Sequence, residues 1–99
     1  MAAWSDGTTA TALTMVKTDL GILQSSLYDA RLTQYILSAK DEIVRQGVND
    51  LSDDIPDVQL VAAFAGWLWS TRDKEGSMPR FIRVMLNNRI FSAKMKAAE

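Results

Sequence analysis

Four aspartates gather in residues 48–57, and their type and spacing could in principle bind a calcium ion: Asp50, Asp53, Asp54 and Asp57. A calcium loop of the EF-hand kind needs a Gly at its sixth position and a Glu at its twelfth. Here the Gly is lacking, and Val61 stands twelfth when Asp50 is counted first. Aspartates also cap helices and solvate loops. We therefore expect helix capping and loop solvation, and no metal site.

A second candidate binding site is the basic stretch over residues 79–98, which contains no acidic residue. Its cations are Arg80, Arg83, Arg89, Lys94 and Lys96. One interpretation is a surface that meets nucleic acid, lines a DNA channel or pairs with a neighbouring subunit. The other is that cations near a helix C-terminus oppose the macrodipole and solvate an exposed face. A pI near 5.3 is unlike that of a stand-alone DNA-binding domain, and both interpretations stay open.

The chain lacks several of the residue types that enzymes use most often for catalysis. It contains no Cys and no His, which removes thiolate nucleophiles, imidazole bases and the usual zinc ligands. Phosphate-binding glycine loops and nucleophile-elbow motifs do not occur either. We expect a protein that is not an enzyme and has no cofactor.

Size and composition predict one folded domain over residues 1–99. The chain has 47% hydrophobic and 23% charged residues, enough apolar material for a core. Its longest apolar run, Leu60 to Trp69, spans ten residues, whereas a membrane-spanning helix needs about 20. The first twelve residues do not resemble a secretory signal. We expect a soluble, intracellular protein without membrane contact.

Hydrophobic periodicity predicts an all-α fold, a small bundle of about four helices. We expect a flexible arm over residues 1–10, then helices over approximately residues 11–20, 26–46, 57–73 and 79–96. Gly21 and Gly47 follow the first two helices as C-terminal caps, and Pro56 and Pro79 mark the first turns of the last two.

The second helix has two further features. Ser26 and Asp29 fit a capping box, in which each side chain accepts from an unpaired backbone N–H. Its main apolar stripe should face the core, while Leu37 and Val44 lie outside that stripe. We interpret these two as a small second patch, either an interface or partly exposed.

The third helix should lie at the centre of the bundle. From Val58 to Trp69 every residue except Gln59 is apolar or Gly, so this helix has no polar face wide enough for a surface position. Fully apolar character predicts burial against several neighbours.

The last helix carries more apolar residues than one core can cover. Between residues 81 and 95 they spread around most of its circumference, far beyond the stripe of an ordinary surface helix. Excess exposed apolar surface often marks a partner site. The candidates for a subunit or portal interface are Phe81, Val84, Phe91 and Met95.

Charge is divided unevenly along the chain. Residues 1–57 hold four basic and nine acidic side chains, and residues 58–99 hold seven basic and three acidic ones. Such asymmetry suits head-to-tail contact between copies or contact with an anionic partner. It does not choose between the two.

The order of these signals resembles the small head-tail connector proteins, or head-completion adaptors, of tailed bacteriophages and prophages. The resemblance covers about residues 13–95 and depends on order and length rather than on one motif. Its segments are VKxxLGI from Val16, SSLYDARLTQYILSAKDEIV, the Asp- and Pro-containing loop, LVAAFAGWLWSTRD and MPRFIRVMLNNRIFSAKM.

The resemblance implies an all-helical subunit that joins a ring of about a dozen copies beneath the portal of a DNA-filled capsid. The ring would extend the DNA channel, let DNA pass without sequence recognition, and hold the next tail-completion protein. The protein would belong to the virion, and to the cytoplasm of the bacterial host during assembly. Members of this family carry no catalytic residues, so none are transferred.

Two other classes stay open from sequence. One is a small helical DNA-binding regulator whose basic last helix enters a groove of DNA. The other is a helical protein-interaction module that forms a complex of low order. The apolar circumference of the last helix leaves few positions for side chains that read base edges, which favours the connector.

Overall fold

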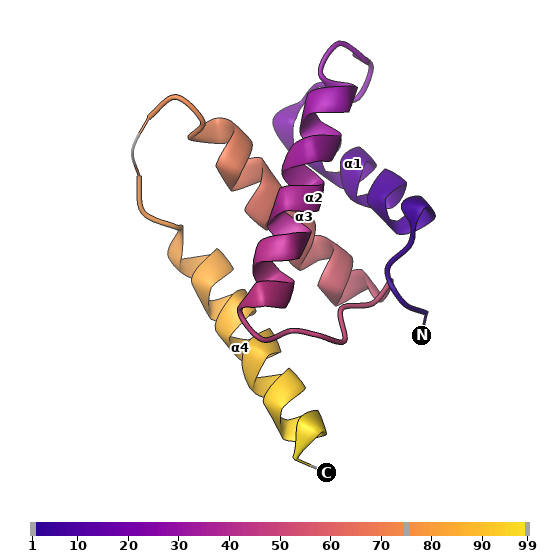
Figure 1. Ribbon diagram of the computed structural model, residues 1–99. Coiled ribbons are helices and arrows are strands. Elements are labelled where there is room, and N and C mark those ends of the chain that lie inside the picture. Colours follow the sequence, from indigo (N-terminus) through magenta and orange to yellow (C-terminus); the bar gives the residue numbers. More distant parts are fainter. Residues whose placement is uncertain (1, 75, 99) are drawn as a thin grey trace.

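The computed structural model describes residues 2–74 and 76–98 and has four helices in this part of the chain (Figure 1). They are α1 (Asp6–Leu20), α2 (Asp29–Arg45), α3 (Ile55–Ser70) and α4 (Arg80–Ala97). The predicted all-α fold of about four helices is confirmed. The predicted boundaries of α2, α3 and α4 lie within three residues of these, whereas α1 begins five residues earlier than expected.

Helix α3 occupies the centre and packs against each of the other three helices. Its buried apolar residues lie around much of its circumference: Val58, Leu60, Val61, Ala62, Phe64 and Ala65. The predicted central position is therefore confirmed, and Pro56 lies in the first turn as expected. Within residues 2–74 and 76–98, no helix combines the length and apolar character needed to cross a membrane.

Helix α2 covers one side of α3 with the predicted stripe. Leu32, Ile36, Ala39 and Ile43 are buried, at the i, i+4, i+7 and i+11 spacing of one helical face. Trp69 near the end of α3 packs its ring against Tyr28, the residue before α2, and Tyr35 of α2, with ring centroids 5.3 Å and 5.7 Å away. These aromatic contacts join the beginning of α2 to the end of α3.

The predicted flexible arm is wrong for the described part of residues 1–10. Helix α1 begins at Asp6, and Ser5 forms a capping box with Thr8. The residues before it lie along the 52–53 loop, where Ala3 forms an isolated antiparallel bridge with Ser52. Trp4 donates from its indole Nε1 to Thr9 Oγ1, 2.8 Å away, and packs against the core.

The physical reason for this difference lies in the threonines of α1. The Thr8 hydroxyl accepts from the Ser5 backbone N–H, and Thr9 donates its hydroxyl to the Ser5 carbonyl four residues earlier, so the polar side chains of the first turn bond within the helix. Small and polar composition hid the first turn of a helix whose buried positions are Thr8, Ala12 and Val16.

The predicted capping box at the start of α2 is also wrong. The helix begins at Asp29, and its N-cap residue Tyr28 makes no side-chain capping bond. The Asp29 carboxylate instead pairs with Lys17 of α1, 2.9 Å away, because the turn after α1 brings these helices together. The predicted glycine caps are confirmed: Gly21 and Gly47 have backbone φ angles of 73° and 121°, a region that favours Gly.

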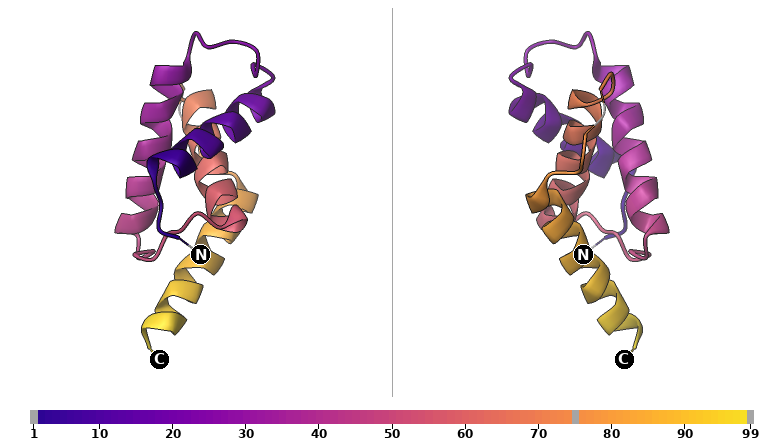
Figure 2. Two further views of the ribbon diagram at one scale, coloured as in Figure 1. Left: turned by 90° about the vertical axis from the view of Figure 1, so that its right-hand side faces the viewer. Right: turned by 90° about the vertical axis from the view of Figure 1, so that its left-hand side faces the viewer.

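Helix α4 lies against α3 along a narrow face and leaves much of its surface exposed. Only Ile82, Leu86 and Ala93 are buried. Its C-terminal end extends beyond the other three helices in all views (Figures 1 and 2). Pro79 stands at the N-cap position, one residue before the first turn.

The two serines offer a matched test of the corrected N-termini. We expect Ser5→Ala to lower the free energy of unfolding by about 1 kcal/mol, since it removes a capping oxygen. Ser26→Ala should change it by less than about 0.5 kcal/mol, the usual range for surface positions. Urea unfolding followed by circular dichroism measures both. Equal effects would contradict the assignment of the caps.

Candidate functional site

The outer face of α4 presents the four apolar residues predicted as an interface. Phe81 is 61% exposed, Val84 47%, Phe91 65% and Met95 56%. None of them contributes to the buried core of the described chain. The structure therefore places all four where a second protein surface can reach them.

These residues and Asn88 form one continuous stripe, which we call the α4 stripe: Phe81, Val84, Asn88, Phe91 and Met95. Successive members are three, four, three and four residues apart, the spacing of the a and d positions of a helix-pairing seam. Sequence reasoning missed Asn88, although the heptad spacing of its neighbours was a usable signal. The stripe is a surface of the shape that packs against another helix.

The predicted cations of α4 separate into two groups. Arg80, Arg83 and Lys94 are exposed, without an intramolecular ion pair within the described residues. The Lys96 amine is also exposed, although it lies 3.4 Å from Asp50 Oδ2. Four of the five predicted cations are thus available to an anionic or acidic partner.

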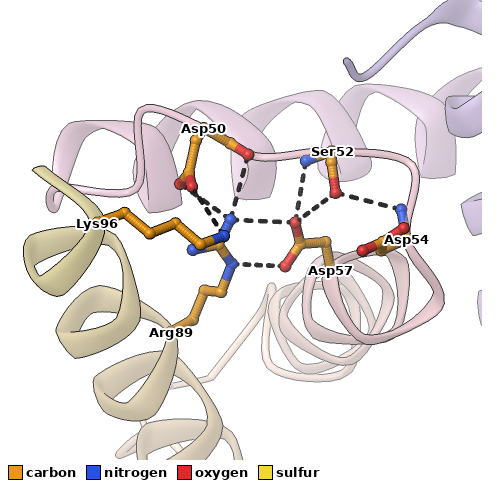
Figure 3. Close-up of polar contacts among 6 residues, drawn as sticks. All are labelled: Asp50, Ser52, Asp54, Asp57, Arg89 and Lys96. Carbon is orange, nitrogen blue, oxygen red and sulfur yellow. Dashed lines mark hydrogen bonds and ion pairs between the residues drawn. The ribbon is translucent and has the colours of Figure 1, made fainter. Parts of the chain in front are cut away.

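The prediction that Arg89 contacts DNA or a neighbouring subunit is wrong. Its side chain forms ion pairs with aspartates of its own chain (Figure 3). Its Nε donates to Asp57 Oδ1 at 2.6 Å, and its Nη2 donates to Asp50 Oδ1 at 2.9 Å. The side chains of Arg89 and Asp57 are only 14% and 6% exposed. This ion-pair cluster fastens α4 to the start of α3 and to the loop before it.

Asp57 is held further by Ser52, whose backbone N–H and hydroxyl both donate to its Oδ2 at 2.9 Å. Burial opposes ionisation of Asp57, but the bonds from Arg89 and Ser52 outweigh it and hold the pKa of this carboxyl below its usual value. Burial likewise opposes ionisation of Asp50, and Arg89 and Lys96 lower its pKa overall. Both carboxylates are therefore ionised at neutral pH.

Aspartates of the 48–57 loop bond to other parts of the chain and hold its elements together. Asp53 accepts from the Ala2 backbone N–H at 2.9 Å. Asp54 is the N-cap residue of α3, but its side chain makes no capping bond. The expectation of capping and solvation missed the buried role of Asp57, because its partner lies 32 residues away in the sequence. Among the described residues, no group of three or more acidic side chains is arranged to hold a metal ion.

An apolar groove lies between α1 and α4, with α3 as its floor. One part has a volume of about 440 Å³, and its lining includes Met15, Asp19, Ala63, Phe81 and Met85. A second part, of about 340 Å³, continues along Gly66 and Trp67. We call these two parts the α1–α4 groove, a feature that sequence reasoning did not anticipate.

Comparison with known proteins adds no family to this description. The chain matches no family model, no curated protein and no solved structure.

Removal of the Arg89 charge tests the ion-pair cluster. We expect Arg89→Met to lower the free energy of unfolding by about 3 kcal/mol, because it leaves the buried Asp57 carboxylate without its cation. Lys94→Met, a matched change on the exposed face, should alter it by less than about 0.5 kcal/mol. Urea unfolding at low protein concentration measures both values. Similar losses in the two variants would mean that the cluster does not anchor α4.

Lowered carboxyl pKa values predict the direction of the pH dependence. Asp57 and Asp50 bind a proton more readily in the unfolded chain, so their stabilisation is present above the ordinary carboxyl pKa of about 4 and is lost as pH falls below it. We expect the free energy of unfolding to fall as the pH drops below about 5, and to fall less in Asp57→Asn. Parallel curves from denaturant titrations at each pH would contradict this assignment.

Proposed function

We propose that this chain is a head-tail connector subunit of a tailed bacteriophage or prophage. Copies assemble into a ring of about a dozen subunits below the portal, extend its DNA channel and hold a tail-completion protein. The protein acts in the virion and in the cytoplasm of its bacterial host during assembly. This role is structural and requires no catalytic residue.

The observation that carries the proposal is the α4 stripe. Four large apolar side chains, each about half exposed or more, lie on one helix face, and exposed apolar surface of this kind marks a protein contact. The stripe includes Asn88, and a single Asn in a helix-pairing seam fixes register at a cost in stability. Ring subunits need a contact of this kind because each must meet its neighbour in one orientation.

The positions of the charges support contact between unlike surfaces. Asp6 begins α1, and Asp53 is tied to the N-terminal residues through Ala2, whereas the exposed cations Arg83 and Lys94 lie on α4. The beginning of α1 and the N-terminal half of α4, which carries Arg80 and Arg83, lie on opposite sides of the molecule (Figure 1). Contacts between two different surfaces of identical subunits generate rings or open filaments.

The exposed cations also suit the passage of DNA. Arg80, Arg83 and Lys94 offer phosphate contacts, which carry no sequence information. The apolar residues between them leave few side chains for base edges, which distinguishes the face from that of a recognition helix. A channel through which DNA slides needs weak contacts of this sequence-independent kind.

Native mass spectrometry over a hundredfold range of protein concentration tests the function. A closed species of about a dozen copies supports the connector. A dimer at every concentration, together with a saturable and sequence-dependent gel shift on DNA, favours a regulator instead. A complex of low order that does not bind DNA favours an interaction module.

One substitution in the stripe links the surface to assembly. We expect Phe91→Asp to abolish association, because it places a charge in the centre of an apolar contact, while the far-ultraviolet circular dichroism of the monomer stays unchanged. The matched control is Leu27→Asp, which places a charge on the segment between α1 and α2, where Leu27 is 77% exposed. Sedimentation velocity measures association. Loss of helical signal in Phe91→Asp would instead make Phe91 part of the fold.

A further inference from the structure

The floor of the α1–α4 groove is unusually open to an approaching side chain. Ala62, Ala63 and Gly66 of α3 form this floor, and a Cβ added to Gly66 would meet no other atom within 4 Å. Met15 of α1 and Phe81 of α4 stand at its edges. Small residues between larger apolar ones leave a concave apolar surface that bulky side chains can fill.

A convex apolar surface is present on the same chain, at the far end of α4. Phe91 and Met95 are 65% and 56% exposed, and this end of the helix extends beyond the other three (Figure 2). We call residues 91–97 the α4 end. Its two large side chains, four residues apart, lie on one helix face.

The α4 end cannot fill the groove of its own chain. Phe81 lines the groove and Met95 lies fourteen residues later on the same helix, which separates them by about 21 Å along the helix axis at 1.5 Å per residue. An α4 end that fills this groove must therefore come from a second copy.

Charge on the two surfaces is complementary. Asp19 lines both parts of the groove, and the lining residues include no Lys or Arg. Lys94 and Lys96 belong to the α4 end, and α4 contains no acidic residue from Arg80 to Ala97. Such an arrangement steers an approaching α4 end toward the groove and fixes its orientation.

We propose that the α4 end of one copy docks into the α1–α4 groove of the next copy. Phe91 and Met95 then cover Ala63 and Gly66, and Lys94 faces Asp19. This inference deepens the proposed function and rests on it, because it specifies the contact that joins ring subunits. Each copy offers one end and one groove, so the contact repeats from subunit to subunit.

Disulfide cross-linking tests the contact in this chain, which has no cysteine of its own. We introduce Ala63→Cys and Met95→Cys separately and together, and oxidise each protein under native conditions. The double variant should give a ladder of disulfide-linked multimers on non-reducing gels. A mixture of the two single variants should give a linked dimer, and each single variant alone should give monomer.

Three results would overturn the contact or separate it from the proposed function. Linked dimers from Met95→Cys alone would mean that the two α4 stripes pair symmetrically, which overturns the inference. A ring in native mass spectrometry without cross-linking in the double variant would overturn the inference and leave the connector function standing. A ladder without any closed ring would support the contact and contradict the connector function.

A charge exchange provides a second readout. Asp19→Lys and Lys94→Asp should each weaken association about tenfold, and the double exchange should restore it. The matched control is Asp41→Lys, which reverses an exposed acid on α2, away from the groove. Sedimentation equilibrium measures the dissociation constants. Failure of the double exchange to restore association, or an equal loss in Asp41→Lys, would overturn the pairing of Lys94 with Asp19.

Discussion

The ion pair between Arg89 and Asp57 is the interaction on which the rest of the surface depends. Helix α4 buries only three side chains, so apolar packing alone holds it weakly, and the buried guanidinium fixes its position against the start of α3. Burial of an ion pair costs desolvation free energy, and loss of either partner leaves the other charge buried without compensation. The cluster thereby fixes the C-terminal half of α4, which carries Phe91 and Met95, against the start of α3 and the loop before it.

The distribution of apolar residues explains why so much of α4 is exposed. Helix α3 is apolar around much of its surface, and α1 and α2 use most of it. What remains accommodates one narrow face of α4 and leaves Ala63 and Gly66 only partly covered. A stripe and a groove left open on one chain favour association, because contact between copies removes both from water.

The sequence predicted features that depend on local periodicity. The central position of α3 followed from its lack of a polar face, and exposure of Phe91 and Met95 followed from an excess of apolar residues that one core could not cover. Features that depend on contacts between residues far apart in the sequence could not be predicted from it. Arg89 looked like a solvent-facing cation because its partner Asp57 lies 32 residues away, and the groove exists only once three helices have packed. The helical start at Asp6 was hidden by Thr8 and Thr9, whose hydroxyls bond to the Ser5 backbone at the start of the same helix.

In the assembly we propose, exposed surfaces of α4 join identical subunits into a closed ring. Electron microscopy of the purified protein in negative stain, at a concentration where it associates, images this assembly. We expect closed rings of uniform size with an open centre, in which every subunit has the same two neighbours. Isolated particles, symmetric dimers or open filaments at every concentration would contradict it.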